Sequence, residues 1–217
     1  SKEETENALI DLKFLGIDNV LALRGDQIKT ESVFVPEPDG HAYAIDLVQQ
    51  IHAMNNGQYL DDETSDASPT DFCIGVSGYP EKHVEAPNLN TDLKHLKAKV
   101  AAGAHYIVTQ MFFDNSKFFD FVALCRKEGI EVPIIPGIKI LTSKSQLSTL
   151  PKLFHIDLPQ DLLDTVERCK NDQAVKEAGI AWAIEQCKAL VAADVPCLHF
   201  YTMGNPESTR KVASALF

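Results

Sequence analysis

The residues that could carry chemistry follow short apolar segments of the sequence. The segment "NVLALRGD" (19–26) runs through Val, Leu and Ala and then ends on Arg24, Gly25 and Asp26. Arg-Gly-Asp is also a cell-adhesion tripeptide, but adhesion requires an exposed flexible loop, whereas this tripeptide is fused to an apolar strand pattern. We therefore expect the two opposite charges to serve a site at the end of a strand.

A second polar group lies on the helix predicted after the apolar segment 71–79. Asp92, His95 and Lys99 have the spacing i, i+3, i+7, which puts all three on one helix face. An acid, an imidazole and an ammonium on one face can hold a polar cofactor tail with phosphates. Spacing alone favours the alternative, a solvated face of an outer helix.

A glutamine in "VTQMFFD" is the third candidate, because Gln110 ends an apolar segment beside Phe112 and Phe113. Its amide offers a donor and an acceptor to an amide or pteridine edge, and aromatic side chains suit a flat ring. A buried glutamine satisfied inside the protein is an equally good interpretation. Further along, the chain is expected to turn at Pro136 and Gly137 before a helix that starts near Gln146.

The elements that position these residues alternate along the chain. Near-continuous apolar segments predict strands buried on both faces, and between them lie patterns of helical period that end at glycine. Right-handed crossovers would wind such a repeat into a parallel sheet or barrel. The predicted strands lack the GxGxxG turn of a dinucleotide-binding sheet and end on polar residues, as in a (β/α)8 TIM barrel. They span 19–25, 71–79, 105–113, 132–140 and 196–203.

The predicted fold class is α/β, a single domain over residues 1–217 that forms part of a TIM barrel. A closed barrel has eight strands and about 250 residues, so we expect this chain to supply about the last five strands. Roughly three N-terminal βα units should lie outside it. Residues 58–71, with five acidic side chains, predict a solvated loop excursion, for which a carboxylate metal site is the weaker alternative. Two helices are expected within 159–194.

Composition limits the possible partners. The chain has 31 acidic and 20 basic residues and a formal charge of -11, which repels nucleic acid and anionic lipid. No apolar run reaches the roughly 18 residues of a membrane helix, so we expect a soluble protein. The five cysteines form no CxxC pair and predict a reducing, cytoplasmic setting. Cys125, Cys187 and Cys197 are expected to be small buried apolar residues, and no metal is expected.

The motifs together resemble a known family. "LRGD", "YPEKHVEA" with "DLKHLKAKVAAGA", "TQMFFD", "IIPGI" and "HFYTM" occur in the order and approximate spacing of methylenetetrahydrofolate reductases, across residues 20–203. The resemblance implies a barrel that binds FAD and reduces 5,10-methylenetetrahydrofolate to 5-methyltetrahydrofolate with NAD(P)H, in one-carbon metabolism and methionine biosynthesis. The nicotinamide reduces the flavin and leaves before the folate takes the hydride. The resemblance also implies the short bacterial form and a homo-oligomer, and leaves NADH against NADPH open.

The resemblance assigns roles to residues at matching positions. Asp26 is the catalytic carboxylate, near the flavin and the folate pterin, where its negative charge disfavours an anionic reduced flavin and stabilises a cationic iminium form of the folate. Gln110 contacts folate and nicotinamide in turn, and Gln146 contacts folate. The FAD-binding residues implied are Arg24, Gly25, Asp26, Ala44, Tyr79, His83, Ala86, Asp92, His95 and Lys99.

The sequence departs from the family pattern at several positions. Ala98 stands where relatives can carry an arginine toward the FAD phosphates. Asn205 stands where relatives often carry an arginine that helps hold the folate glutamate tail, and Arg210 is a candidate substitute. The family's general-acid glutamate on the first strand is not found, and Glu3, Glu4 and Glu6 belong to a predicted surface helix. We therefore expect the 217-residue chain alone to be inactive and to bind FAD weakly.

Two other function classes remain open at this stage. One is a different TIM-barrel enzyme, an aldolase or a phosphate-binding isomerase, which would need a catalytic lysine such as Lys139. The other is a non-catalytic ligand-binding or assembly module. A bound flavin in the full-length protein would favour the reductase over both.

Overall fold

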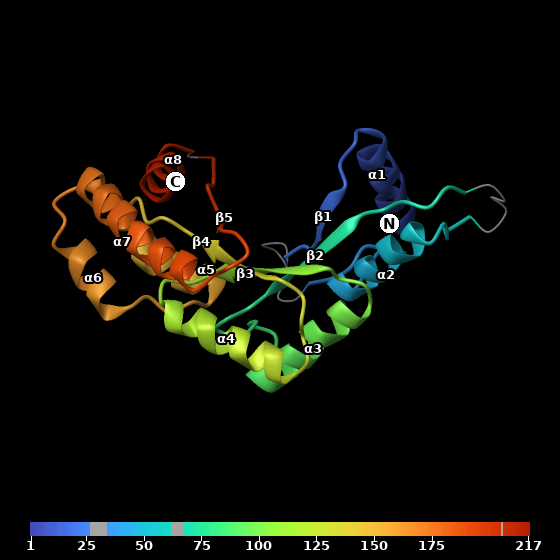
Figure 1. Ribbon diagram of the computed structural model, residues 1–217, viewed down its shortest axis with the longest axis horizontal. Helices are drawn as coiled ribbons and strands as arrows, with labels where there is room; N and C mark the ends of the chain where they lie inside the picture. Colours follow the sequence, from blue (N-terminus) through green and yellow to red (C-terminus); the bar gives the residue numbers. More distant parts are fainter. Residues whose placement is uncertain (27–33, 62–66, 205) are drawn as a thin grey trace. The chain divides into compact units, whose positions relative to one another are not determined.

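The computed structural model describes residues 1–26, 34–61, 67–204 and 206–217, in which helices and strands alternate along the chain (Figure 1). The predicted α/β class is confirmed, and so are the two helices expected within 159–194. In chain order the elements are α1 (Lys2–Phe14), β1 (Asn19–Ala22), α2 (Ala44–Asn55), β2 (Cys73–Gly78), α3 (Leu89–Ala101), β3 (Tyr106–Met111), α4 (Asn115–Lys127), β4 (Ile134–Ile138), α5 (Gln146–Phe154), α6 (Gln160–Glu167), α7 (Asp172–Ala192), β5 (His199–Phe200) and α8 (Pro206–Leu216).

The strands form one five-stranded sheet in the order β1-β2-β3-β4-β5. The pair β1 and β2 is parallel and starts in register at Asn19 and Cys73, and the pair β4 and β5 is parallel with Gly137 opposite His199. Strand order that follows chain order, with a helix after each strand, is what right-handed crossovers produce. The predicted organisation of the sheet is therefore confirmed for the described residues.

Three details of the prediction were wrong. Within β1 only Ala22 is buried and Leu21 is exposed, so this strand is not buried on both faces. Pro136 and Gly137 lie inside β4 and form no turn. A Cβ atom on Gly137 would lie 2.2 Å from the carbonyl oxygen of Thr109, so the glycine serves a close approach of two backbones. Cys197 is exposed, unlike the buried Cys125 and Cys187.

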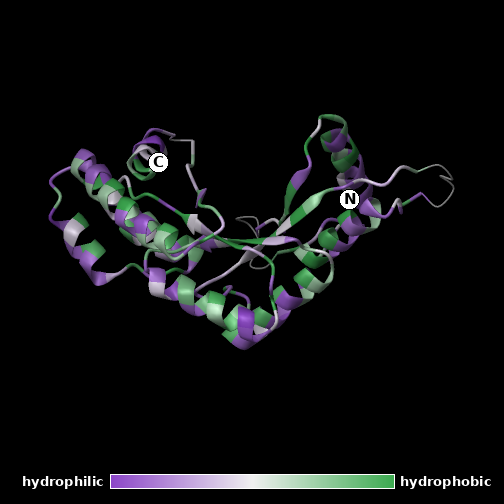
Figure 2. Ribbon diagram, viewed as in Figure 1, coloured by the Kyte–Doolittle hydropathy of each residue, from purple (hydrophilic) through white to green (hydrophobic). Residues whose placement is uncertain are grey.

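The chain divides into two compact units, of which the first contains Ser1–Ser77 and Lys94–Ile107. Helix α2 buries Val48, Ile51 and Met54, whose spacing of three residues puts them on one face. Figure 2 shows apolar and polar residues side by side along α2, as expected for a helix with one buried face.

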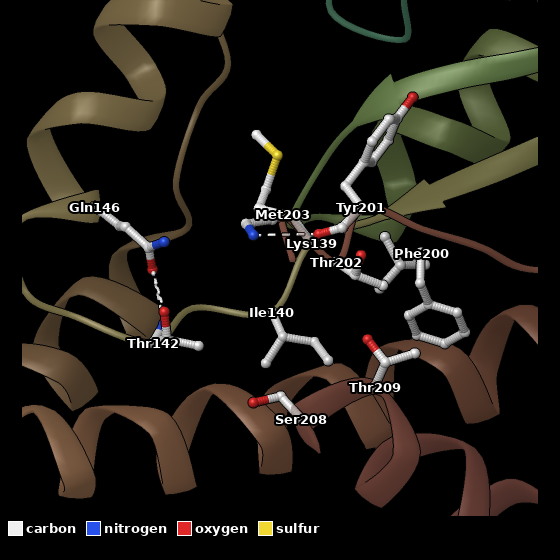
Figure 3. A pocket seen from close by; sticks show the side chains of 11 residues that line it. Lys139, Ile140, Thr142, Gln146, Phe200, Tyr201, Thr202, Met203, Ser208 and Thr209 are labelled. Carbon is white, nitrogen blue, oxygen red and sulfur yellow. Dashed lines mark hydrogen bonds between the residues drawn. The ribbon is translucent and has the colours of Figure 1, made fainter. Parts of the chain in front are cut away.

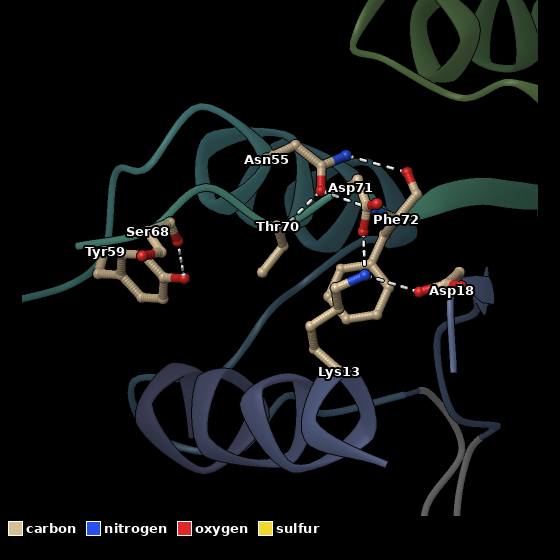
Figure 4. A network of polar contacts seen from close by, with 8 residues as sticks. All are labelled: Lys13, Asp18, Asn55, Tyr59, Ser68, Thr70, Asp71 and Phe72. Carbon is tan, nitrogen blue, oxygen red and sulfur yellow. Dashed lines mark hydrogen bonds and ion pairs between the residues drawn. The ribbon is translucent and has the colours of Figure 1, made fainter. Parts of the chain in front are cut away.

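A polar network in the first unit fixes the start of β2 (Figure 4). The side-chain amide of Asn55 accepts hydrogen bonds from the Thr70 hydroxyl at 2.7 Å and from the Phe72 amide, and donates to the Phe72 carbonyl oxygen. Lys13 pairs with Asp18 and Asp71, and hydrogen bonds to both carboxylates raise the pKa of its ammonium. The loop predicted over 58–71 is thus anchored at its end. Its acidic residues Asp62, Glu63 and Asp66 lie outside the described residues.

The second unit contains Gly78–Leu93 and Val108–Phe217. Its core joins the end of β3 to α5, α6 and α7, and Trp182 packs against it and donates to the carbonyl oxygen of Phe113 at 3.2 Å. Burial raises the pKa of the Cys125 thiol to about 12 and that of Cys187 to about 11, so both stay protonated and act as small apolar residues. The core cluster consists of Met111, Phe113, Leu141, Leu150, Ile156, Leu162, Val166 and Val175.

None of the helices in the described part of the chain is both long and apolar enough to cross a membrane.

We expect Gly179→Ala to destabilise the protein by about 1–3 kcal/mol, because overpacking a filled core has this cost. The added Cβ would lie 2.1 Å from the carbonyl oxygen of Leu141, a backbone atom that cannot move aside alone. Helix propensity by itself predicts the opposite sign, a gain of ~1 kcal/mol. Urea unfolding measures the difference. Ala181→Gly at an exposed position of α7 isolates the propensity term, and a stabilised Gly179→Ala variant would show that the contact is absent.

Candidate functional site

In the first unit, the predicted site residues at the end of β1 form a short irregular segment. The Arg24 guanidinium lies 4.7 Å from the centre of the Phe34 ring, a cation-π distance. A Cβ on Gly25 would be 3.7 Å from the same ring, so the glycine is also next to it. Asp26 is exposed. The sequence analysis missed Phe34, which is separated from this segment by residues that carry no motif.

Two other predicted residues of the first unit, Ala44 and Lys99, belong to helices. Ala44 is the first residue of α2, and the preceding turn is closed by Asp46, whose carboxylate accepts from the Tyr43 amide at 2.9 Å. Lys99 in α3 donates to the carbonyl oxygen of Ser77, at the end of β2, at 2.7 Å. This bond holds the Lys99 ammonium at the carboxyl end of a strand, while His95 one turn earlier is exposed.

In the second unit, the loop after β2 brings predicted residues together. The Tyr79 and His83 rings meet edge to face with centroids 4.6 Å apart. The Asp92 carboxylate accepts from the His83 amide at 2.8 Å, and Lys82 donates to the carbonyl oxygen of the buried Ala86 at 2.6 Å. The carboxylate of Asp92 therefore holds the loop that carries Tyr79 and His83.

A small pocket connects this loop to β3, and it contains both Tyr79 and Gln110. The Gln110 side chain is half-buried, and its oxygen accepts from the Met111 amide at 3.0 Å. Because a backbone donor binds the oxygen, the amide nitrogen is the end left for a ligand. The aromatic residues expected beside Gln110, Phe112 and Phe113, are buried and are not among the residues that line this pocket, whereas Tyr79 supplies a lining ring that was not expected.

The same pocket contains Glu81, which sequence reasoning missed. One of its oxygens accepts from the Asp157 amide at 2.6 Å, and the other is buried without a hydrogen-bond partner among the described residues. Burial raises the pKa of this carboxyl. A glutamate directly after the Tyr-Pro pair at a strand end was the available signal.

A larger pocket of about 250 Å³ lies at the ends of β4 and β5 and contains Gln146 (Figure 3). The oxygen of Gln146 accepts from the Thr142 amide at 2.7 Å and from the Ser143 amide at 3.3 Å. The side-chain nitrogen is again the end left for a ligand. Lys139, 6% exposed, lines the pocket and donates to the carbonyl oxygen of Tyr201 at 3.1 Å.

Burial shifts the pKa values of two side chains that line this pocket, Lys139 and Tyr201. Burial lowers the pKa of the Lys139 ammonium, and it raises the pKa of the Tyr201 hydroxyl to about 12, with a smaller contribution from Tyr79. The Tyr201 hydroxyl donates to the carbonyl oxygen of Thr109 at 2.9 Å. Tyr201 is thus a neutral donor that fixes one wall.

The structure describes Ala98 and the candidate substitute Arg210, but not Asn205. Ala98 is exposed on α3, and Arg210 is exposed on α8 and is not among the described residues that line the larger pocket. Arg210 is therefore poorly placed as a substitute for the missing arginine. Asn205 lies outside the described residues.

Comparison with known proteins decides the family. A family model for methylenetetrahydrofolate reductase matches residues 1–216. The chain belongs to the methylenetetrahydrofolate reductase family. The relatives are named as reductases of methylenetetrahydrofolate, which makes the family one of oxidoreductases in folate and one-carbon metabolism.

Relatives in fungi, plants and bacteria share this assignment. Methylenetetrahydrofolate reductase 1 of Schizosaccharomyces pombe is 35% identical over 217 residues, which is 100% of this chain and 34% of the relative. Methylenetetrahydrofolate reductase (NADH) 1 of Arabidopsis thaliana is 39% identical and is matched over 95% of this chain and 34% of its own length. The 5,10-methylenetetrahydrofolate reductase of Buchnera aphidicola is 31% identical, with 93% and 61% covered. The chain thus spans about a third of the length of these fungal and plant relatives.

We expect Glu81→Gln to remove part of the pH dependence of stability in this reductase-family chain. In the unfolded state the Glu81 carboxyl has an ordinary pKa of about 4.5, and in the folded state its pKa is higher. Between these two pKa values the unfolded state has lost the proton that the folded state keeps, so the free energy of unfolding falls as the pH rises through the raised pKa. A glutamine keeps an acceptor for the Asp157 amide and does not ionise. The difference in urea midpoint between variant and parent should therefore grow between pH 4.5 and 8. The exposed Glu131→Gln is the control, and a constant difference would contradict the burial argument.

Proposed function

We propose that the protein to which this chain belongs reduces 5,10-methylenetetrahydrofolate to 5-methyltetrahydrofolate with NAD(P)H and FAD. The observation that carries the proposal is the family match over residues 1–216. It is supported by polar side chains at the carboxyl end of every strand, the place where TIM barrels concentrate their chemistry. These residues are Arg24 and Asp26 after β1, Tyr79 after β2, Gln110 next to the last residue of β3, Lys139 after β4 and Tyr201 after β5.

We also infer that β1 to β5 belong to a (β/α)8 barrel. Parallel pairing of β1 with β2 and of β4 with β5, strand order that follows chain order, and a helix after each strand all support this. A cytoplasmic location is part of the proposal, supported by five cysteines that are all free thiols. The homo-oligomer implied by the resemblance stays a prediction.

Each unit has side chains of types that suit one part of a flavin dinucleotide. In the first unit, Arg24 and Lys99 supply cations of the kind that bind phosphates. In the second unit, the Tyr79 and His83 rings supply aromatic surface. When bound, FAD would supply the hydride-transfer chemistry. Further contacts are expected from Gly25, Ala44, Ala86, Asp92 and His95, of which Asp92 acts through the loop that it holds.

The remaining roles follow from the side chains of this chain. Asp26 is a fixed negative charge that stabilises positive charge on the folate in the transition state. Gln110 and Gln146 each have their oxygen bound by backbone amides, so both present nitrogen donors to acceptors on the ligand. Because the oxygens are held before the ligand arrives, these donors need little reorganisation on binding.

Anaerobic spectroscopy of the full-length gene product tests the function. The purified protein should be yellow, should bleach when NADH or NADPH is added, and should regain its colour when methylenetetrahydrofolate follows. The nucleotide that bleaches faster identifies the donor. The 217-residue chain, run beside it, tests the expectation that this part alone lacks turnover. A full-length protein that binds no flavin would falsify the proposal.

We expect Asp26→Asn in the full-length protein to slow the folate half-reaction at least tenfold, which corresponds to roughly 1.4 kcal/mol of transition-state stabilisation. Loss of the negative charge also stabilises the anionic reduced flavin, so the reduction potential should rise. Stopped-flow absorbance gives the rate, and equilibrium dye reduction gives the potential. Asp11→Asn, an exposed carboxylate change on α1, is the control. If rate and potential both match the parent, Asp26 has only a structural role.

A further inference from the structure

The walls of the larger pocket are unusual in their charge. Among its described lining residues, Lys139 is the one cation and none is an aspartate or glutamate. The volume of about 250 Å³ has room for about eight water-sized groups, at ~30 Å³ each. A pocket of this size suits one amino-acid-sized part of a ligand.

The buried ammonium of Lys139 is poorly compensated by the protein itself. An ammonium has three donors, and the hydrogen bond that it makes to the described residues goes to a neutral acceptor, the carbonyl oxygen of Tyr201. A buried charge is costly unless it is paired, and burial lowers the pKa of this group accordingly. An anion in the pocket would remove that cost.

An independent observation in the same pocket points to a ligand. Ser208 is 2% exposed, and its hydroxyl has no hydrogen-bond partner among the described residues. Buried hydroxyls without partners are rare in native proteins. Figure 3 shows Ser208 among the pocket residues, and it belongs to the first turn of α8, where the helix dipole favours anions.

The neighbouring acidic residue does not cancel this field. Glu207 precedes Ser208 in α8, but it is exposed and pairs with Lys176 and Lys211. The donors around the pocket are therefore the Lys139 ammonium, the Ser208 hydroxyl and the side-chain nitrogen of Gln146. One compact positive charge with neutral donors matches a carboxylate, whereas a phosphate dianion usually draws an arginine fork or several cations.

We propose that this pocket binds a carboxylate of the ligand, with the Lys139 ammonium as its charge partner and the Ser208 hydroxyl as a second donor. Where that ligand is a folate, through its acidic tail, the proposal rests on the function proposed above. Lys139 is then a residue that positions the substrate and determines its specificity, and it takes no part in the transfer itself.

Binding of fragments to the full-length protein tests the subsite without requiring turnover. N-(4-aminobenzoyl)-L-glutamate should bind the parent, and 4-aminobenzamide, which has no carboxylate, should bind at least tenfold more weakly. Lys139→Met should weaken the carboxylate probe at least tenfold and leave 4-aminobenzamide unchanged. Ser208→Ala should show the same selectivity with a smaller loss. NMR or calorimetric titration measures all of these.

A matched control and a folding measurement keep the result interpretable. Lys152→Met removes an equal charge from an exposed position on α5 and should leave both affinities unchanged. The melting temperature of ligand-free Lys139→Met should equal or exceed that of the parent, because a costly buried charge is removed. A purely structural lysine would instead lower the melting temperature and weaken both probes, and that result would overturn the proposal.

The other outcomes separate the subsite from the reductase function. Loss of carboxylate binding in Lys139→Met, in a protein without flavin or turnover, would support the subsite and contradict the function. Full turnover with equal probe affinities in parent and Lys139→Met would support the function and overturn the subsite. Inorganic phosphate that displaces the carboxylate probe at lower concentration than glutarate does would overturn the carboxylate assignment in favour of a phosphate site.

Discussion

The arrangement of the second unit depends on a close approach at Gly137. A side chain there would meet the carbonyl oxygen of Thr109 at 2.2 Å and the ring of Tyr201 at 2.6 Å. Because glycine has no Cβ, its amide can donate to the Thr109 hydroxyl at 2.9 Å, and the Tyr201 ring can lie against β4. The same contact places the carbonyl oxygen of Tyr201 within reach of the Lys139 ammonium. The pocket at the ends of β4 and β5 therefore depends on one missing methyl group.

Hydrogen bonds from backbone amides orient several of the predicted site side chains. Gln110 binds the next amide along the chain with its oxygen, and Gln146 binds two amides of the loop before its own helix. In the loop after β2, the Asp92 carboxylate plays the corresponding part for His83. Burying a polar group without a hydrogen-bond partner costs free energy. In each case here one end of the side chain has a hydrogen-bond partner nearby in the chain, and the other end is left to a ligand. This is how short loops can hold binding groups in fixed orientations.

The sequence predicted elements and motif residues well, because apolar periodicity and the positions of polar residues after strands are local properties. The order of helices and strands followed from it, whereas the pocket shared by Tyr79 and Gln110 was not predicted. It failed where one residue type serves two purposes. Gly137 was interpreted as a turn and is a packing contact, and Cys197 was interpreted as buried and is exposed. Contacts between distant positions, such as that of Lys139 with Tyr201, have no local signal.

The charge of the chain and the charge of its larger pocket have opposite signs, and distance decides which of them matters. The net charge of -11 repels an anionic ligand in solution, but salt at physiological strength screens such fields beyond roughly 8 Å. Inside the pocket the nearest charge is the Lys139 ammonium, in a setting where burial weakens screening. Arg210, exposed on α8, has a charge that water screens, so an arginine there cannot replace a buried lysine. Recognition of an acid by this acidic protein is therefore a short-range matter, determined by how few carboxylates the pocket wall contains.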